Sequence, residues 1–275
     1  MKISTIALLL SVIMTMQNKV VAQELKPAVD KNVNSSITPT QDMISQAYGG
    51  EGSQQYNLGY HYLHGKGVKQ SNDEAKKWFD LAAKSNSPAA RYKIGRLYET
   101  GVFYKKDIDK AVYHYEFAAK KGEVYALNNL AILYLTGEGV AQDIDKGISF
   151  AKKAASRGNA EAQVNLGLVY LNGTGVTIDR VQALNWFEEA AKDTHPVALY
   201  YLAEHAFAEK DYVRAYNYYL TSAEQSNANA QLKLAMLYGK GIGTEKDHEK
   251  SLKWLKEAAK LGNKKAIFML KRMEK

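Results

Sequence analysis

The sequence contains no cysteine and only four prolines in 275 residues. The lack of cysteine excludes disulfide bonds, a lipid-modified cysteine, and thiolate ligands or nucleophiles. After residue 22 there is no run of 18 apolar residues, so no later membrane span is expected. No stretch alternates β-branched residues in the manner of a strand. The motifs of P-loop nucleotide hydrolases, H-E-x-x-H zinc proteases, EF-hand calcium loops and G-x-S-x-G hydrolases are also missing.

The first 22 residues differ from the rest of the chain. Lys2 gives a short positive end, residues 3–16 are mostly apolar, and small residues precede Gln23. This layout is typical of a cleavable secretory signal, with cleavage expected after Ala22. The apolar run is short for a bilayer span, although an uncleaved anchor is the alternative. The sequence therefore predicts a periplasmic or secreted protein.

The formal net charge is +8, of which Lys2 and Lys19 contribute two. We interpret the remaining excess as spread over many lysines on a solvated surface, with a mild preference for acidic partners. Nucleic acid is not expected as a partner. Stable membrane insertion is not expected once the signal has been removed.

From residue 53 onward the chain repeats itself. Gly59, Gly95, Ala131 and Gly167 mark the same position at a constant step of 36 residues, and Tyr62, Tyr98, Tyr134 and Tyr170 follow the same step. A period of this length indicates stacked supersecondary units. The sequence therefore predicts a repeat protein.

Each repeat reads as two helices, at about 53–64 and 73–84 in the first copy, because its apolar residues recur every three or four positions. Gly59 lies inside the first of these helices, where glycine is unfavourable, and close approach of the second helix would explain it. Gly65 and Gly67 follow that helix, where glycine can take a positive φ. We expect a long, glycine-containing turn between the two helices.

The unit A-x-x-x-L-G-x-x-Y-x-x-G-x-G-V, followed by A-x-x-W/F and A-A-x-x-G, resembles the Sel-1-like repeat family, a longer-turned relative of the tetratricopeptide repeat. The resemblance implies an all-α protein, an α/α solenoid with a right-handed superhelix, built from about six Sel-1-like helical hairpins and a C-terminal capping helix. The expected repeats are 53–88, 89–124, 125–160, 161–196, 197–228 and 229–264, with the cap at 265–275.

Two parts of the chain depart from the regular pattern. The fifth repeat advances by 32 residues and lacks the glycine turn, so it resembles a tetratricopeptide repeat proper. Residues 23–52 are polar, and we expect a disordered spacer with a possible short helix at 40–48, capped by Thr40.

No catalytic constellation is visible, and we expect neither an enzyme nor a cofactor. His61 and His64 lie three residues apart, but without a third ligand we interpret them as surface or packing residues, and we predict no metal site. Trp78, Trp186 and Trp254 share one repeat position and are interpreted as packing residues, with ligand stacking as the alternative.

In tetratricopeptide-like stacks the first helix of each hairpin lines the concave surface. The resemblance therefore implies a partner-binding face made by these helices, and aromatic and arginine side chains are the usual anchors of such surfaces. For each tyrosine on this face, packing between neighbouring first helices is an equally open alternative. The predicted partner-binding residues are Tyr56, Tyr60, Tyr92, Arg96, Glu99, Tyr125, Asn128, Tyr200, Glu204 and Phe207.

Three functions are compatible with these observations. The first is a non-catalytic exported scaffold or adaptor that binds a protein or peptide on its concave face. The second is a periplasmic immunity or inhibitor protein that neutralises a secreted toxic effector of the lipase type. The third is a cell-envelope accessory protein that binds peptidoglycan.

Overall fold

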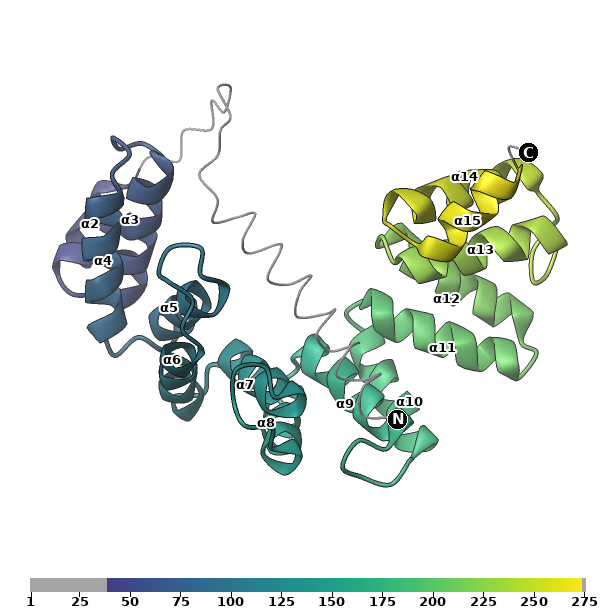
Figure 1. Ribbon diagram of the computed structural model, residues 1–275, viewed down its shortest axis with the longest axis horizontal. Coiled ribbons are helices and arrows are strands. Elements are labelled where there is room, and N and C mark those ends of the chain that lie inside the picture. Colours follow the sequence, from purple (N-terminus) through teal and green to yellow (C-terminus); the bar gives the residue numbers. More distant parts are fainter. Residues whose placement is uncertain (1–38, 274–275) are drawn as a thin grey trace. The chain divides into compact units, whose positions relative to one another are not determined.

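The computed structural model describes residues 39–273, which contain fourteen helices and no strand (Figure 1). The expected signal at 1–22 and most of the expected spacer lie outside this range. The chain divides into two compact units, unit 1 up to Arg157 and unit 2 from Gly158, and each is described by itself.

The fold of both units is a row of helical hairpins, in which we call the first helix of each hairpin helix A and the second helix B. Unit 1 contains α2 (Gln41–Tyr48), α3 (Gly52–His64), α4 (Asn72–Lys84), α5 (Pro88–Thr100), α6 (Ile108–Lys120), α7 (Val124–Thr136) and α8 (Ile144–Ala155). Unit 2 contains α9 (Ala160–Asn172), α10 (Arg180–Ala191), α11 (Pro196–Ala208), α12 (Tyr212–Glu224), α13 (Ala228–Lys240), α14 (His248–Lys260) and α15 (Lys264–Met273).

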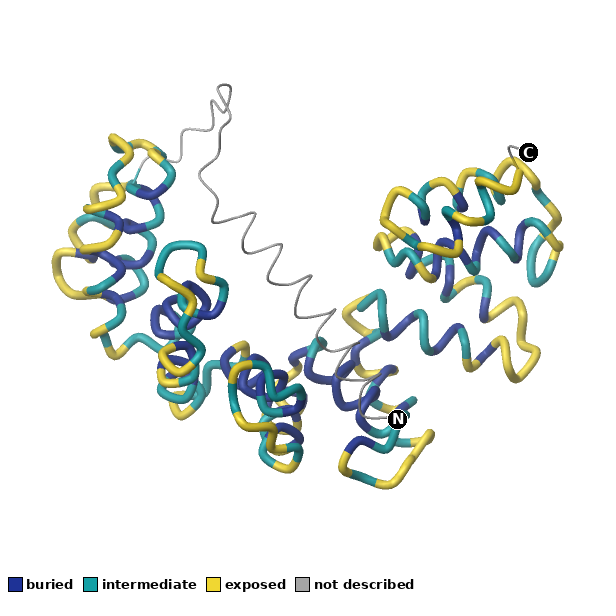
Figure 2. Tube along the Cα trace, viewed as in Figure 1, coloured by how far each residue is buried: buried dark blue, intermediate teal, exposed yellow. Residues whose placement is uncertain are grey.

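The hairpins α3–α4, α5–α6 and α7–α8 build unit 1, and α9–α10, α11–α12 and α13–α14 build unit 2. Within each unit, helix B also packs on helix A of the next hairpin, as α6 does on α7 and α12 on α13. The buried residues follow these contacts (Figure 2). The fold is an all-α repeat solenoid, as the sequence predicts.

Both ends of the row carry an additional helix. Before the first hairpin, α2 is capped by the Thr40 side chain and packs on α3, where Ala47 meets Leu58 and Trp78. After the last hairpin, α15 is a helix A without a helix B, and its Ala266 packs against Leu255 of α14.

The glycines inside helix A permit close contact with helix B. A Cβ built on Gly59, Gly95 or Gly167 would lie 2.7, 2.6 or 2.4 Å from an aromatic carbon of Phe79, Tyr115 or Phe187 respectively. Such distances are well below van der Waals contact, so a larger residue forces the ring to move. This contact explains why glycine recurs at these positions despite its helix propensity.

The long turn is closed in the same way in five repeats. The first glycine, such as Gly65 at φ 63°, ends helix A in the left-handed conformation. The N-cap residue of helix B then donates its backbone N–H to the carbonyl of the tyrosine that recurs in helix A. In the third repeat, for example, Asp143 N lies 3.0 Å from Tyr134 O. Its side chain accepts from the N–H three residues on, as Asp143 does from Lys146 at 2.9 Å.

Two turns differ, and both differences are visible in the sequence. In the second repeat Phe103 stands where the other four long turns have their second glycine; it packs on Phe79, with ring centroids 5.0 Å apart. In the fifth repeat only residues 209–211 separate α11 from α12, with Lys210 at φ 63°. This short connection is the tetratricopeptide-like turn that the 32-residue step predicts.

Replacing Gly167 with alanine tests the helix contact. The new Cβ would collide with Phe187, and overpacking outweighs the gain in helix propensity, so we expect the free energy of unfolding to fall by about 1–2 kcal/mol. Gly239→Ala is the matched control, because its Cβ would meet only the Ser251 side chain, at 3.1 Å and beyond. Urea denaturation followed by circular dichroism measures both; equal effects of the two changes would contradict the contact.

Candidate functional site

A pocket of about 430 Å³ lies in unit 2, between the fourth, fifth and sixth repeats. Its wall is formed mainly by α10 and α11, with one residue each from α9 and α13. Two of the predicted partner-binding residues, Tyr200 and Glu204, line it, because they lie four residues apart on the same face of α11. The other lining residues are Leu171, Arg180, Ala183, Leu184, Phe187, Tyr201, His205 and Asn229.

Aromatic rings form the apolar part of this pocket. The rings of Phe187 and Tyr201 are stacked, with centroids 4.8 Å apart and planes within 7° of parallel. Tyr200 meets Tyr201 edge-on at 5.4 Å and lies 6.1 Å from the ring of Tyr219. Phe187 is buried against Gly167, whereas Tyr201 is half-buried and offers part of its ring to a bound group.

Glu204 is the charged centre of the pocket. The hydroxyl of Tyr219 donates a hydrogen bond to its Oε1, and the Lys233 Nζ of the next repeat lies 2.7 Å from Oε1 and 2.9 Å from Oε2. Burial, with the neighbouring Glu204 carboxylate, raises the pKa values of Tyr219 and Tyr200 well above their usual range. The carboxylate is therefore held in one position by two repeats, while Arg180 and His205 provide exposed polar groups at the edge.

A related carboxylate cluster is buried in unit 1. The hydroxyl of Tyr115 donates to Glu99 Oε2, and the Asn129 amide donates to Glu99 at 3.3 Å and to the Tyr115 oxygen at 3.1 Å. Arg96 Nε is 3.7 Å from the same carboxylate, and its Nη1 is 3.4 Å from the Tyr92 hydroxyl. Burial, followed by the nearby Glu99 charge, raises the pKa of Tyr115 well above its ordinary value.

The two clusters share a plan that our sequence analysis missed. Tyr115 and Tyr219 occupy the same position of helix B, where the first and fourth repeats have Phe79 and Phe187. In each cluster the tyrosine hydroxyl donates to a glutamate on helix A of its own repeat, and that glutamate also accepts a hydrogen bond from a polar side chain on helix A of the next repeat. The sequence did carry a signal for these clusters: tyrosine stands in the second and fifth repeats where phenylalanine stands in the first and fourth. A buried tyrosine hydroxyl needs a hydrogen-bond partner, so a polar side chain had to be expected nearby.

The remaining predicted residues fall into a buried group and a partly exposed group. The buried group is Tyr56, Arg96, Glu99 and Asn128. In the second group, Tyr92 is half-buried and its ring stacks with that of Tyr125, with centroids 5.8 Å apart. Tyr60 is half-buried beside His64, while Tyr125 and Phe207 are exposed, by 60% and 37%.

Burial affects what each of these residues can offer a partner. A buried side chain presents little surface, so Glu99 and Arg96 contribute to the packing of unit 1 in this structure. Exposed or half-buried surface on helix A remains at Tyr60, Tyr92, Tyr125, Tyr200, Glu204 and Phe207.

The two histidines lie in the last turn of helix α3. His61 Nδ1 lies 2.8 Å from the Lys66 carbonyl, and His64 stacks on Tyr60 with centroids 4.1 Å apart. Burial, with Lys66 and His61 nearby, lowers the pKa of His64. Among residues 39–273 no three His, Asp or Glu side chains come together in a way that could hold a metal ion.

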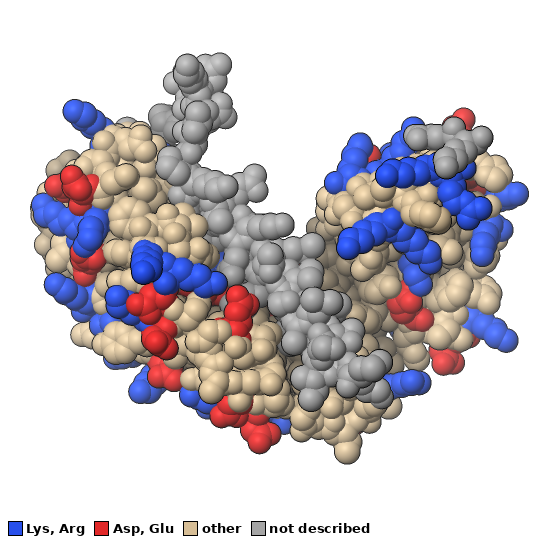
Figure 3. Space-filling view, viewed as in Figure 1, with Lys and Arg blue, Asp and Glu red and all other residues tan. Residues whose placement is uncertain are grey.

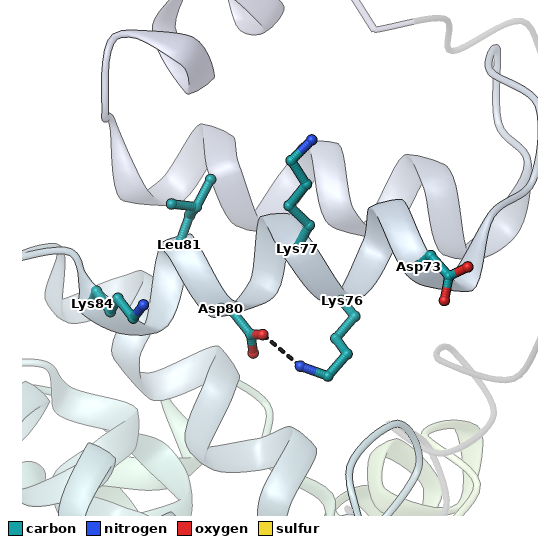
Figure 4. Close-up of a pocket in the computed structure, with 6 residues that line it drawn as sticks. All are labelled: Asp73, Lys76, Lys77, Asp80, Leu81 and Lys84. Atoms are coloured by element: carbon teal, nitrogen blue, oxygen red, sulfur yellow. Dashed lines mark hydrogen bonds and ion pairs between the residues drawn. The ribbon is translucent and has the colours of Figure 1, made fainter.

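Two further hollows lie in unit 1. One, of about 400 Å³, is lined by a single face of α4, where Lys76 Nζ and Asp80 form an ion pair at 2.6 Å (Figure 4). The other, of about 510 Å³, lies between α6, α7 and α8 beside Phe150, Lys153 and Arg157. The first is a shallow surface between side chains of one helix, so it lacks the converging groups of the α11 pocket.

A row of helical hairpins that pack in sequence, with an aromatic and acidic pocket between α10 and α11, defines a helical repeat protein. The Sel1 repeat model matches residues 55–87, 88–123, 124–159, 160–195, 196–227 and 228–263. The chain belongs to the Sel1 repeat family. No curated protein sequence matches it.

Solved structures agree with this assignment. A Sel1 repeat protein from Oxalobacter formigenes shares 30% identity with a TM-score of 0.70, over 76% of this chain and 88% of that one. The protective antigen c5321 of uropathogenic Escherichia coli shares 30% identity with a TM-score of 0.73, over 84% of this chain. The chain spans 50% of the length of c5321. The immunity protein Pa5087 from Pseudomonas aeruginosa, at 19% identity and TM-score 0.51 over 78% of this chain and 83% of that one, shares the fold.

Proposed function

We propose that this protein is a non-catalytic scaffold that binds a protein or peptide on the helix A surface of unit 2, at the α11 pocket. Sel1 repeats generally mediate protein–protein interaction, which supports the class of function. The observation that carries the location is the pocket itself, where the Phe187 and Tyr201 rings adjoin a carboxylate fixed by Tyr219 and Lys233.

The chemistry of the pocket favours one kind of anchor. Its volume of about 430 Å³ is at the lower end of ligand pockets and suits one or two side chains of a partner. The half-exposed Tyr201 ring suits an apolar or aromatic side chain, and Asn229 and His205 at the edge suit a peptide backbone. Tyrosine-lined pockets of this kind commonly hold the few residues that dominate an interface.

Replacing Tyr201 with alanine should weaken partner binding by about thirtyfold, because a hot-spot aromatic contributes about 2 kcal/mol. The measurement is affinity capture with the full chain as bait, quantified by mass spectrometry. Tyr113→Ala is the matched control, since Tyr113 is exposed by 63% on helix α6 of unit 1. Recovery of the same partners in the same amounts by Tyr201→Ala would refute the location, provided that both variants keep the wild-type circular dichroism spectrum.

Export remains part of the proposal. Its support is the charge and apolar pattern of residues 1–22, which lie outside the described residues. An N-terminus at Gln23 in protein purified from the cell envelope would agree with it, and a cytoplasmic protein that retains Met1 would contradict it.

The immunity and peptidoglycan hypotheses stay predictions. Pa5087 resembles this chain in fold at 19% identity, and a shared repeat fold is compatible with many functions. Protection of cells against a secreted effector, lost in the Tyr201→Ala variant, would convert the scaffold proposal into the immunity one. Sedimentation with purified peptidoglycan tests the third hypothesis.

A further inference from the structure

The positive charge of the chain is concentrated at its C-terminal end. Residues 240–275 contain eleven lysines and arginines against five acids, a net charge of +6. Residues 23–239 contain 24 of each sign and are neutral overall. Our interpretation of the excess as spread over the whole surface was therefore wrong, and Figure 3 shows the basic side chains gathered over α14 and α15.

The last helix carries an exposed aromatic ring surrounded by cations. Phe268 is 61% exposed, and Lys264, Lys265, Lys271 and Arg272 lie four and three residues before it and three and four after it. In a helix these spacings place all five side chains on one face. All four cations are exposed, and the Arg272 guanidinium is 5.9 Å from the centre of the Phe268 ring.

The opposite face of α15 is the one that packs. Ala266 is buried, and Met269 and Leu270 pack against the cluster around Leu232 and Leu255. Phe268 is not part of that cluster. The fold of unit 2 therefore leaves this ring and its four cations facing outward.

Helix α14 extends the same charge. Lys253, Lys256 and Lys260 are exposed and fall on one stripe, opposite the buried Leu255 and Ala258. Between 240 and 273 the ion pairs present are Lys250 with Asp247 at 3.3 Å and Lys260 with Glu257 at 2.6 Å, both solvent-exposed. We call Lys264, Lys265, Phe268, Lys271, Arg272 and these three α14 lysines the basic end.

We propose that the basic end binds the surface of an anionic lipid bilayer, with Phe268 entering the headgroup region and the cations facing the lipid phosphates. Clustered lysines are attracted to anionic membrane surfaces, and an aromatic ring adds interfacial partitioning. The binding is peripheral, since none of the helices within residues 39–273 is long and apolar enough to cross a membrane. A symmetric dimer through this surface is disfavoured, because the two basic ends would repel each other.

Charge and shape favour lipid over an acidic protein. Three of the four cations around Phe268 are lysines, which act as point charges and suit a diffuse anionic surface better than a bidentate carboxylate site. No pocket borders α15 to receive a partner side chain among the cavities described above. The inference is independent of the α11 pocket.

The lack of cysteine allows a site-specific test. Phe268→Cys in the full chain is labelled with an environment-sensitive fluorophore and mixed with phosphatidylcholine vesicles that contain or lack phosphatidylglycerol. We expect a blue shift only with phosphatidylglycerol, reversed by high salt because screening weakens the attraction. Val181→Cys, which replaces an exposed residue at the start of α10, is the control label and should not shift.

The second measurement is the affinity of the unlabelled chain, which keeps Phe268, for the two types of vesicle. The combined change of Lys264, Lys265, Lys271 and Arg272 to glutamine should lower the phosphatidylglycerol-dependent part of binding by about 600-fold, at about fivefold per cation. The same change at Lys69, Lys105, Lys152 and Lys153, four exposed lysines of unit 1, is the matched control. Residues 1–22 are identical in the two quadruple variants, so any background that they contribute cancels in the comparison of the two.

Three results would overturn the proposal. They are a label at position 268 that does not respond to phosphatidylglycerol, equal losses in the two quadruple variants, and binding to polyglutamate with none to the vesicles. The last would assign the basic end to an acidic protein.

Discussion

Replacing Glu99 with leucine should lower the free energy of unfolding of unit 1 by about 3 kcal/mol. Glu99 is 2% exposed and accepts hydrogen bonds from the Tyr115 hydroxyl and the Asn129 amide. Leucine leaves the fully enclosed Tyr115 hydroxyl without its acceptor, and an unsatisfied buried donor is costly. Urea denaturation followed by circular dichroism measures the change.

A double variant separates this polar contact from the loss of packing. Phenylalanine fills the position of Tyr115 in the first and fourth repeats, so Glu99→Leu with Tyr115→Phe removes the acceptor and the hydroxyl together. We expect the double variant to lose less than the sum of the two single changes. Glu138→Leu, at a surface ion pair 3.7 Å from Lys106, should change stability by less than about 1 kcal/mol. Additive single changes would contradict a shared buried network.

Acidification should destabilise unit 1 through His114. This histidine is buried; its ring stacks on Tyr98 with centroids 5.7 Å apart, and the Arg91 Nη1 donates toward its Nδ1 at 3.4 Å. Burial, reinforced by the Arg91 charge, lowers the pKa of His114 to about 4 from 6.5. The fold therefore favours the neutral ring.

The direction of the pH effect follows from that shift. A basic group whose folded-state pKa is lowered contributes its full stability above the unfolded pKa, and loses it as the pH falls from 6.5 to about 4. The loss should reach about 3 kcal/mol at the lower limit, at 1.36 kcal/mol per pKa unit. Urea denaturation between these pH values measures it.

Two variants isolate the contribution of His114. The third repeat has Phe150 at this position, so His114→Phe should keep the packing and remove most of the pH dependence in this window. His248→Gln, at an exposed residue of α14, should leave the dependence unchanged. An unchanged slope in His114→Phe would show that the ring is not forced to stay neutral.

The regular parts of the fold could be predicted from the sequence because each rests on local chemistry repeated several times. Gly59, Gly95 and Gly167 recur where helix B crosses, and the shorter turn of the fifth repeat reduces its step from 36 to 32 residues. The candidate site could be predicted from the sequence only in part. The pattern identifies helix A, but it does not decide which of its side chains turn toward a neighbouring repeat.

Glu204 and Glu99 show where that limit lies. Both were predicted as partner-binding residues, and each accepts a hydrogen bond from a tyrosine of helix B in its own repeat and from a polar side chain of the next repeat. These partners lie between 15 and 30 residues away in sequence, so they depend on packing rather than on a local motif. Glu204 keeps a half-buried surface in a pocket, whereas Glu99 is enclosed.

The location of the partner site is tested most directly by photo-crosslinking at two single positions. Benzoylphenylalanine in place of Tyr201 lies in the α11 pocket, and in place of Tyr113 it lies on the exposed surface of helix α6. After irradiation in the intact cell, a discrete protein adduct at position 201 and none at 113 is the result that we predict. An adduct at 113 with none at 201 would contradict binding at the helix A surface of unit 2.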